Sequence, residues 1–394
     1  MIETVSVKSA PSRPPRRSAP TISDVAKLAG VSVMTVSRVV NNGKHVREAK
    51  REAVNAAIAA LNYAPNLAAR SLAGAGQVRI GLLHSNPSAG FLSELLIGSL
   101  DQAGRDNVQI VVEKCEVGDH EAEVARHLID GRIDGVILPP PLCEAPALLA
   151  LFAEARVPAV SVATSLPPSD VLSIRVNDRE AAAVMTRHIM SLGHRRIGFI
   201  AGDPTLSASA QRAQGYREAL EEAGIPVDPA LIVDGLFTYR SGLDAAELLL
   251  ELDEPPTAIF SSNDDMAAAT VAVAHRRGLD VPGDLTVCGF DDTALSTAIW
   301  PELTTIHQPI ADMARAAVEL LVGIVRRQSG DESVATDRVL DYILVRRQSD
   351  AAPRQRPRAI PMALELNFAG GMRSAKAVAL GLKPNHLVEV GQLP

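Results

Sequence analysis

The sequence lacks the features of several large classes of protein. No apolar run approaches the ~18 residues that a membrane-spanning helix needs, and the first 20 residues are basic and proline-rich without the apolar segment of a signal peptide. Three cysteines, Cys115, Cys143 and Cys288, lie far apart and do not have the spacing of metal ligands. We therefore expect a protein without membrane or export signals, with buried thiols, in the reducing cytoplasm.

Motifs of common enzymes are also missing. No G-x-G-x-x-G follows the first strand-like run, and there is no G-x-x-x-x-G-K-[ST], no G-x-S-x-G and no histidine cluster with metal spacing. The pairs Asp264-Asp265 and Asp291-Asp292 resemble glycosidase carboxylates. Neighbouring residues of a strand point to opposite faces, so neither pair can supply two acids to one bond, and we favour a helix cap and one ligand contact for each pair. We expect no catalytic residues, no bound metal and no cofactor.

The charges that are present lie unevenly along the chain. Residues 1–79 contain 12 Lys and Arg against 4 Asp and Glu, whereas residues 80–394 contain 27 against 42, for a net charge of −7. The length of 394 residues favours two or three domains, and 47% apolar with 22% charged residues is typical of a globular protein. A basic head on an acidic body favours a phosphate-binding module joined to a body that avoids DNA.

The basic head has the pattern of a helix-turn-helix. Thr21 and Asp24 form the pattern of a capping box, and Gly30 is placed to end the first helix. A second helix over 33–40 and a third over 48–61 follow. Ser32 is placed to cap the second helix. The inner face of the third is predicted to contain Ala53, Ala57, Ile58 and Leu61.

A plain helical hairpin is the alternative for this segment. Both interpretations bury the same apolar residues, namely Val25, Ala26, Val31, Val36 and Val39. The residues that discriminate are Val33, Met34, Thr35, Ser37 and Arg38, because a packed hairpin would not need them and the second helix of a DNA-binding unit would.

The segment Val31 to Asn41, "VSVMTVSRVVN", carries a resemblance to a known family. It matches the "VSxxTVSRVxN" of the LacI/GalR family of bacterial repressors, and residues 21–76 resemble the headpiece of that family. The resemblance implies apolar base contacts from Val33 and Met34, a hydrogen-bonded base contact from Arg38, and phosphate contacts from Thr35 and Ser37. The full set of implied DNA contacts is Thr21, Ser32, Val33, Met34, Thr35, Ser37, Arg38, Asn41, Asn66, Ala69 and Leu72.

Two further features bear on this resemblance. The family usually begins its third helix with a serine cap, where this chain has Arg47, which could instead contact phosphate together with Lys50. Residues 65–76 read alone as an alanine-rich linker. In the family this segment is a hinge helix that folds on DNA, and the resemblance implies that Leu72 wedges between base pairs in the minor groove.

The body, from residue 78 onward, alternates strand-like and helix-like runs as parallel α/β sheets do. The predicted strands are 79–84, 109–112, 135–139, 158–162, 196–201, 257–262 and 285–290. The predicted helices are 91–102, 121–129, 179–191, 209–223, 241–252 and 266–277. Ligands of such sheets bind beyond the carboxyl ends of the strands. These ends contain Ser85, Asn86, Pro139, Ala163, Asn263, Asp264, Asp291 and Asp292.

The resemblance continues to about residue 349, as the periplasmic-binding-protein-like core of the same family. The matching motifs are "LGHRRIGFIAG", "QRAQGYREAL", "AIFSSNDDMA", "VCGFDD" and "LTTIHQP". The predicted fold is therefore α/β, with an all-α helix-turn-helix headpiece and two Rossmann-like, parallel-sheet lobes. The resemblance implies effector contacts from Ser85, Phe91, Arg212, Phe237, Asn263, Asp291 and Gln308. Alternatively, Arg212 pairs with a surface acid and Asn263 caps a helix.

These residue types suit a polyol. A guanidinium, a carboxylate and an amide can bind vicinal hydroxyls, and an aromatic ring packs on apolar C–H groups. The amino-terminal lobe departs from a fully polar pocket, because Leu138 to Pro141 and Ala163 stand where other members have polar side chains. We therefore expect a sugar or sugar derivative with one hydroxyl-rich end and one less polar end.

The expected organisation has five parts. These are a disordered basic arm (1–20), the headpiece (21–64), a hinge (65–76), the core (78–349) and a mobile tail (350–394) that lacks the heptads of a tetramerising coil. Lobe 1 would take 78–176 and 309–337, and lobe 2 would take 177–308 and 338–349, with crossovers near Val176, Gln308 and Arg338. We expect a homodimer on near-palindromic double-stranded operator DNA, with half-sites about one helical turn apart.

Two rival functions remain at this stage. A sugar-binding transport receptor would share the body, but it would need an export signal and no basic head. A sugar-converting α/β enzyme would need a nucleophile with its base, or a metal set, and neither is found in the sequence. A repressor controlled by a small-molecule effector therefore fits the sequence best, without an indication of which effector or which sign of response.

Overall fold

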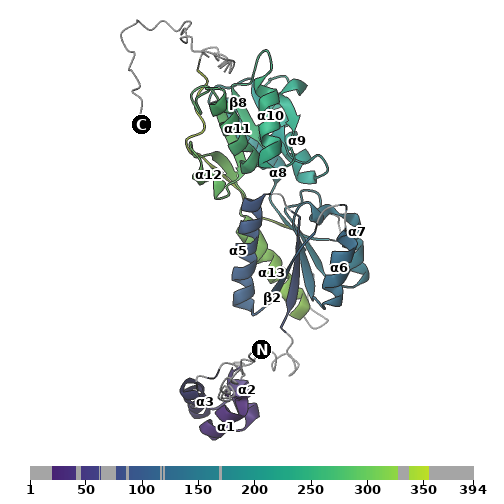
Figure 1. Ribbon diagram of the computed structural model, residues 1–394, viewed down its shortest axis with the longest axis vertical. Coiled ribbons are helices and arrows are strands. Elements are labelled where there is room, and N and C mark those ends of the chain that lie inside the picture. The colour runs from purple at the N-terminus through teal and green to yellow at the C-terminus, as the bar shows by residue number, and fades with distance from the viewer. Residues whose placement is uncertain are drawn as a thin grey trace, which may run out of the picture.

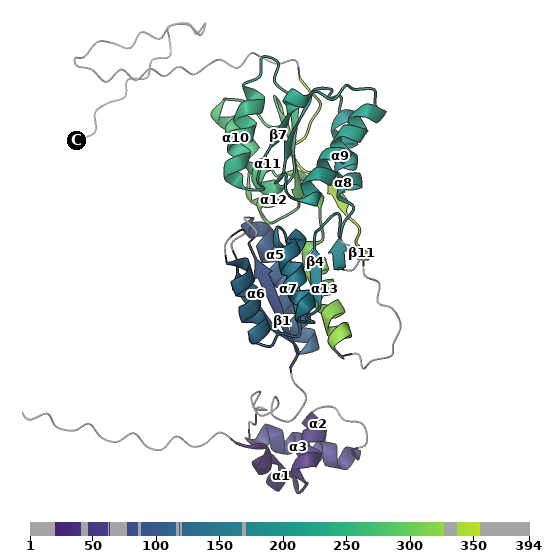
Figure 2. The same ribbon diagram turned by 90° about the vertical axis from the view of Figure 1, so that its right-hand side faces the viewer.

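The computed structural model describes residues 20–40, 46–61, 63, 77–85, 88–115, 118, 120–167, 171–326 and 337–354. A three-helix unit precedes two α/β lobes that are stacked along the long axis of the molecule (Figure 1, Figure 2). No helix in these ranges is long and apolar enough to cross a bilayer. The arrangement confirms the predicted fold class of a helical head and two parallel-sheet lobes.

The three-helix unit contains α1 (Ile22–Ala29), α2 (Val33–Val40) and α3 (Glu48–Leu61). The predicted start and end of α1 are confirmed, because Thr21 and Asp24 form a reciprocal capping box and Gly30 has φ 64°. A small apolar core joins the three helices. Its buried members are Val25, Ala26, Val36, Val39, Val54 and Ala57, so Val54 belongs to the inner face of α3 although it was not among the residues predicted there.

Lobe 1 is built on six parallel strands in the order β11-β5-β4-β3-β1-β2. The strands are β1 (Arg79–His84), β2 (Gln109–Lys114), β3 (Gly135–Leu138), β4 (Ala159–Val162), β5 (Leu172–Arg175) and β11 (Asp337–Val339). Helices α5 (Ala89–Asp106) and α13 (Ile310–Arg326) pack together on one face, and α6 (Glu121–Asp130) and α7 (Pro146–Glu154) cover the other (Figure 1). A short 3-10 helix, η1 (Leu142–Glu144), follows β3.

Lobe 2 repeats this architecture with the strand order β12-β10-β9-β8-β6-β7, in which only the β10–β12 pair is antiparallel. The strands are β6 (Ile197–Ala201), β7 (Ile232–Asp234), β8 (Ala258–Ser261), β9 (Thr286–Asp291), β10 (Thr304–His307) and β12 (Ile343–Val345). The helices are α8 (Asp178–Ser191), α9 (Ser207–Glu222), α10 (Tyr239–Leu250), α11 (Asp264–Arg276), the short α12 (Leu295–Ala298) and the 3-10 turn η2 (Pro229–Leu231). The pairs α8–α9 and α10–α11 each pack on one another, and a separate apolar cluster lies under each pair.

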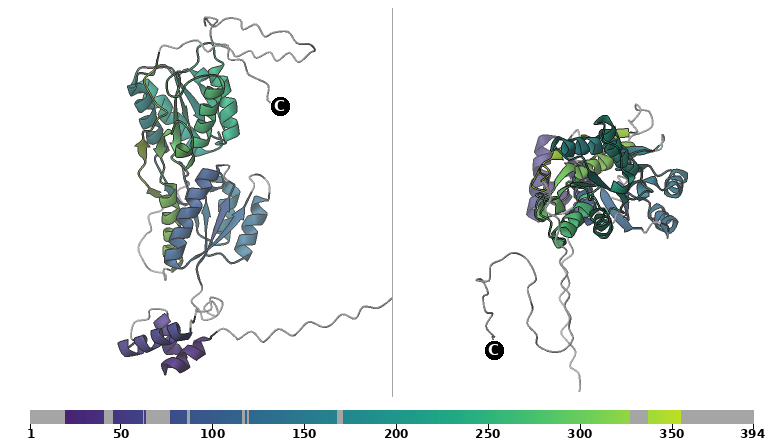
Figure 3. Two further views of the ribbon diagram at one scale, coloured as in Figure 1. Left: turned by 60° about the vertical axis from the view of Figure 1, so that its left-hand side comes forward. Right: turned by 90° about the horizontal axis from the view of Figure 1, so that it is seen from above.

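The chain passes between the lobes three times (Figure 3). It leaves lobe 1 after β5, returns between β10 and α13, and crosses again between β11 and β12. Arg338 lies inside β11, so the last passage follows that residue. Lobe 1 is consequently assembled from two separate stretches of sequence, one that ends with β5 and one that includes α13 and β11. The three cysteines are free and buried, as expected from the sequence.

Candidate functional site

Helix α2 presents the side chains that the resemblance assigns to DNA. Val36 and Val39 face the core, while Val33 and Met34 have exposed fractions of 43% and 66%. Arg38 is exposed as well. A short, well-anchored helix that points large apolar side chains and a guanidinium at solvent is suited to reading base edges in a major groove.

The start of α2 is fixed by local hydrogen bonds. The Thr35 N–H donates to Ser32 Oγ at 3.2 Å, and the two hydroxyls lie 2.9 Å apart. Thr35 and Ser37 are partly buried. Thr21 caps α1 through Asp24, so its hydroxyl is engaged in the fold of the free headpiece. The predicted contacts Asn41, Asn66, Ala69 and Leu72 lie outside the described residues.

A pocket lies between the two lobes, with about 550 Å³ of empty space when the part open to solvent is included. Its wall is formed largely by residues at the carboxyl ends of β3, β4, β6, β7, β8, β9 and β10 and at the start of α5 and α9. The lining residues are Ser88, Phe91, Pro140, Pro141, Ala163, Asp203, Leu206, Ala208, Arg212, Leu236, Phe237, Asn263, Asp291 and Gln308. The position agrees with the rule for open parallel sheets.

Six of the seven residues that the resemblance assigns to the effector meet in this lining. They are Phe91, Arg212, Phe237, Asn263, Asp291 and Gln308. Ser85 is not among the lining residues, and Ser88 lines the pocket from the same segment. Ser88 is the N-cap of α5, where its Oγ accepts from the Phe91 N–H and donates to Asp265 Oδ2 of lobe 2 at 2.6 Å.

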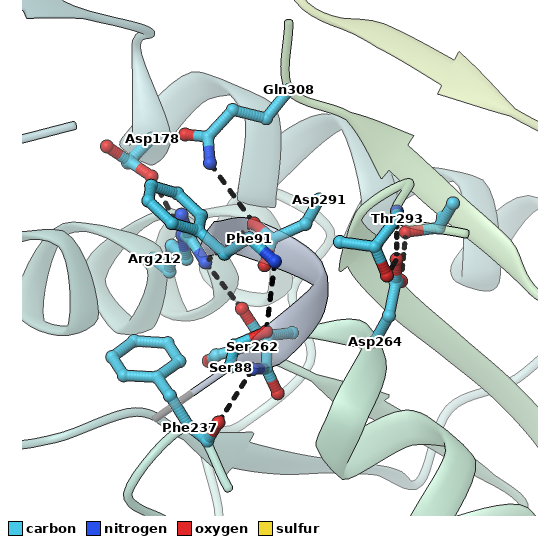
Figure 4. Close-up of polar contacts among 12 residues, drawn as sticks. Ser88, Phe91, Asp178, Arg212, Phe237, Ser262, Asp264, Asp291, Thr293 and Gln308 are labelled. Carbon is cyan, nitrogen blue, oxygen red and sulfur yellow. Dashed lines mark hydrogen bonds and ion pairs between the residues drawn. The ribbon is translucent and has the colours of Figure 1, made fainter. Parts of the chain in front are cut away.

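Arg212 is held at the pocket wall by direct contacts with groups of lobe 2 (Figure 4). Its Nε donates to Asp178 Oδ1 at 2.7 Å, and Nη1 donates to the Ser262 carbonyl. The guanidinium carbon stands 3.6 Å from the centroid of the Phe290 ring, a cation–π contact. The partner of Arg212 is therefore a buried acid and not a surface acid, and the guanidinium is pre-oriented at the pocket wall.

Asp291 and Gln308 form the second polar pair of the pocket. Gln308 Nε2 donates to Asp291 Oδ1 at 3.1 Å, and Arg212 Nη1 lies 3.9 Å from the same oxygen. Burial raises the pKa of Asp291 well above its usual range, and the neighbouring guanidinium opposes that shift. Gln308 is 2% exposed, and its Oε1 has no hydrogen-bond partner among the described residues. A buried acceptor without a partner at a pocket wall indicates a ligand that donates a hydrogen bond.

Asn263 and Phe237 connect the fold to the pocket. Asn263 Oδ1 accepts from the Met266 N–H and so caps α11, as the alternative interpretation expected, while Nδ2 donates to the Phe237 carbonyl. The Phe237 ring lies directly over Gly202, where any added Cβ would collide with the ring. Phe237 has φ 56°, a strained value for an aromatic residue. Asn263 therefore supports the ring that forms the wall, as well as facing the pocket itself.

Asp264 is a buried carboxyl of this region with a structural role. Asp264 is fully buried behind the pocket, where it accepts from Thr305 Oγ1 at 2.7 Å and from the Thr293 N–H at 2.8 Å (Figure 4). Burial raises its pKa to about 7, and these hydrogen bonds partly counter the rise. The side chain connects the start of α11 to the loop after β9 and to β10. Within the described ranges, no group of three or more His, Cys, Asp or Glu could hold a metal ion.

A large part of the lining is apolar. Pro140, Pro141 and Ala163 come from lobe 1, and Leu206 and Leu236 come from lobe 2. The lobe 1 members were expected from the sequence, whereas the two leucines, which lie in loops that follow strands, were not. The pocket therefore combines a cluster of polar groups on lobe 2 with an apolar wall shared by the two lobes.

A helical unit with an outward-facing second helix, joined to a two-lobed core with a pocket between the lobes, defines a ligand-responsive DNA-binding regulator. Two family models match the chain: bacterial regulatory proteins of the lacI family over residues 21–66, and a periplasmic binding protein-like domain over residues 186–349. Catabolite control protein A of Priestia megaterium is 36% identical over 318 residues, which is 80% of this chain and 95% of that protein.

Solved structures agree with these matches. The lac repressor dimer bound to operator and the anti-inducer ONPF has a TM-score of 0.69 and 31% identity, over 84% of this chain and 99% of that one. The complex of the transcriptional regulator CelR with cellobiose has a TM-score of 0.64 and 32% identity, with the same coverage. The chain belongs to the lacI family of bacterial regulatory proteins. It is a DNA-binding transcription regulator with an effector-binding domain and not an enzyme.

Proposed function

We propose that this regulator is a repressor whose affinity for operator DNA is controlled by an uncharged sugar or sugar derivative. The observation that carries the proposal is the polar cluster on lobe 2. Arg212, Asp291 and Gln308 converge on one wall of the pocket, and Gln308 keeps a buried acceptor without a partner among the described residues. A hydroxyl group can donate to that acceptor and accept from a neighbouring N–H, which is the chemistry of a polyol.

The charges around the pocket favour a neutral ligand. Arg212 is the only cationic side chain in the described lining, and two of its nitrogens already donate to Asp178 and Ser262. Asp203 and Asp291 add carboxyls to the same wall. A phosphorylated sugar or a carboxylate would therefore meet more acid than base, and burying an unpaired anion is costly.

The shape of the wall favours a ligand with two different ends. Hydroxyl groups would face the lobe 2 cluster, and the other end would lie against Pro140, Pro141, Leu206 and Leu236. A β-linked disaccharide or a glycoside with an apolar aglycone has this character, because sugar rings present C–H faces that pack on apolar groups. A relative in this family, CelR, has been solved with cellobiose.

The regulator is proposed to act as a homodimer on a near-palindromic operator. Lobe 1 exposes Ile97 and Leu100 on α5 and Val112 on the adjacent edge strand β2, with exposed fractions of 52%, 58% and 43%. Large apolar side chains on one side of a lobe favour burial against a partner. The lac repressor has been solved as a dimer bound to operator. The prediction for this chain is that Leu100→Arg yields monomers in light scattering and weakens operator binding.

The expected domain limits stay predictions. Limited proteolysis followed by mass spectrometry should cut first within 65–76 and after about residue 350. Operator DNA should protect the first of these segments if it folds on DNA as a hinge.

The test of the effector is a binding screen on the intact protein. Calorimetry with neutral monosaccharides, disaccharides, aryl glycosides, phosphorylated sugars and purine bases should give heat with a neutral glycoside or disaccharide, and Gln308→Leu should weaken that binding by about tenfold. The same compound should change retardation of the upstream DNA of the gene. Tight binding of only a phosphorylated sugar or a purine would overturn the proposal, and full response to a small free hexose at low concentration would contradict the ligand with two different ends.

A further inference from the structure

Helix α9, which carries Ala208 and Arg212 of the pocket, begins without a cap from its own chain segment. Its N-cap residue is Leu206, which makes no side-chain hydrogen bond to the first turn. The missing acceptor comes from the other lobe. Glu144, the last residue of η1 in lobe 1, accepts from the Ser207 N–H through Oε2 at 2.9 Å and from the Ser207 hydroxyl through Oε1. An orphan N–H at a helix start is thus satisfied across the cleft.

Further hydrogen bonds converge on the same contact from lobe 1. The N–H groups of Ser165 and Leu166 donate to Ser207 Oγ at 3.0 and 3.1 Å, and Thr164 Oγ1 donates to Glu144 Oε1 at 2.9 Å. These residues follow Ala163, whose φ of 57° turns the backbone sharply at the end of β4. Ser207 is therefore surrounded by lobe 1 groups although it is the first residue of a lobe 2 helix.

The contact is connected to the effector-binding arginine. The Ser165 hydroxyl donates to Asp178 Oδ2, and the other oxygen of Asp178 accepts from Arg212 Nε at 2.7 Å. Asp178 is 1% exposed and belongs to lobe 2. The groups at the lobe contact and the guanidinium at the pocket wall consequently form one continuous network of hydrogen bonds.

We propose that Glu144 is a positioning residue that holds the two lobes in a closed arrangement, defined here by the Glu144–Ser207 contact. A carboxylate is stabilised at the amino end of a helix by the unsatisfied N–H groups and the helix dipole. Separation of the lobes would return both partners to water and leave Arg212 without the lobe 1 part of its network. A ligand shifts the equilibrium between open and closed lobes only by its differential affinity for the two arrangements. A residue that stabilises the closed arrangement therefore sets how far a ligand bound between the lobes can shift that equilibrium.

The inference rests on the proposed function only for the identity of the ligand, since closure can be measured without one. Cysteines for spin labels are introduced at exposed Arg126 of α6 and Glu221 of α9, and the distance between the labels is measured by pulsed electron paramagnetic resonance in the ligand-free, full-length protein. The three natural cysteines are buried, which favours labelling at the two introduced sites.

In the spin-labelled protein, Glu144→Ala should lower the ratio of closed to open molecules by about tenfold or more. This fold-change corresponds to the usual contribution of a hydrogen bond to a charged group. Glu144→Gln, which keeps an acceptor but loses the charge, should fall between Glu144→Ala and the parent. Glu154→Ala, an exposed glutamate at the end of α7, is the matched control and should leave the distances unchanged.

Ser207→Ala provides a second route if Glu144→Ala does not fold. It removes the hydroxyl but keeps the N–H, and it should also increase the open fraction. Identical distance distributions for the parent and the folded Glu144 or Ser207 variants would overturn the proposal. A sugar screen that fails while these variants still open the cleft would refute the proposed effector and leave the role of Glu144 standing.

Discussion

Asp178 and Arg212 form an ion pair, with Nε and Oδ1 2.7 Å apart, whose side chains are 1% and 5% exposed. The two residues come from the first turn of α8 and the middle of α9, which pack closely together. Both ions have lost their hydration, so each depends on the other and on the surrounding hydrogen bonds. Asp178 does not line the pocket, but it fixes the orientation of a side chain that does.

Asp178→Ala should therefore destabilise the core strongly. Removing one partner leaves a buried guanidinium without its counter-ion, and we expect the free energy of unfolding to fall by roughly 3–5 kcal/mol. Glu222→Ala is a matched control on the same pair of helices, because it removes an exposed partner of Arg187 and should cost less than about 1 kcal/mol. Urea unfolding followed by circular dichroism measures both. Equal effects of the two substitutions would contradict the assigned role.

Two glycines of α5 should respond in opposite directions. A Cβ at Gly98 would collide with the Ala311 carbonyl oxygen of α13, so Gly98→Ala should force the helices apart and cost about 1–3 kcal/mol. A Cβ at Gly104 would meet no neighbouring group within 4 Å, and Gly104→Ala should raise stability by about 0.5–1 kcal/mol through its helix propensity. Thermal unfolding of the two variants and the parent measures both changes in stability. A stable Gly98→Ala protein would show that α5 and α13 do not pack as described.

The buried carboxyl of Asp264 should make stability depend on pH. Burial raises its pKa from 3.8 to about 7. Between these two pH values the Asp264 carboxyl is protonated in the folded chain and ionised in the unfolded chain. Its contribution to stability is therefore fully present below about pH 4 and is lost as the pH rises to about 7. The expected loss is on the order of a few kcal/mol.

Asp264→Asn isolates this effect from the other carboxyls. The free energy of unfolding is measured for both proteins across that pH range, and the variant is subtracted from the parent. The difference should fall steadily from about pH 4 to about pH 7 and then level off. A difference that stays constant with pH would show that Asp264 is charged throughout in the folded protein.

Arg38 should determine specific binding to DNA. Loss of its guanidinium in Arg38→Ala should weaken operator binding by about 1–3 kcal/mol, the usual value of a bidentate base contact. Arg38→Lys keeps the charge but not the forked geometry, so it should retain binding to nonspecific duplex while losing specificity. Fluorescence anisotropy at a fixed salt concentration, with operator and scrambled duplexes, gives both affinities. Unchanged operator affinity in a folded Arg38→Ala protein would refute the assignment of α2 to the major groove.

Much of the fold could be predicted from the sequence, because its long elements have strong periodicity. The run at 79–84 and the helix at 48–61 have the predicted limits. Short strands escaped prediction: β7 and β11 have three residues each, too few to show alternation. Helix α13 was also missed, although its apolar residues recur at helical spacing from Ile310 onward and would have revealed it.

The candidate site was predictable where one residue acts alone and unpredictable where two must meet. Arg212 and Gln308 stand out within motifs of the chain. By contrast, the pairing of Arg212 with Asp178 spans 34 positions and depends on how α8 and α9 pack. Similarly, the sequence cannot place Glu144 beside Ser207, because that contact exists only once the two lobes have met. Ser85 was predicted to contact the effector, but Ser88 lines the pocket, because the chain enters α5 at Ser88, the N-cap of that helix.

The discontinuous construction of lobe 1 has a consequence for protein synthesis. Its edge strand β11 and its covering helix α13 are encoded after the whole α8-to-β10 part of lobe 2. When the ribosome has produced residues 77–176, one face of the lobe 1 sheet still lacks its covering helix α13. That face stays partly uncovered, or must be shielded, until more than a hundred further residues have been synthesised. The amino-terminal half of the core, expressed alone, should accumulate as insoluble material.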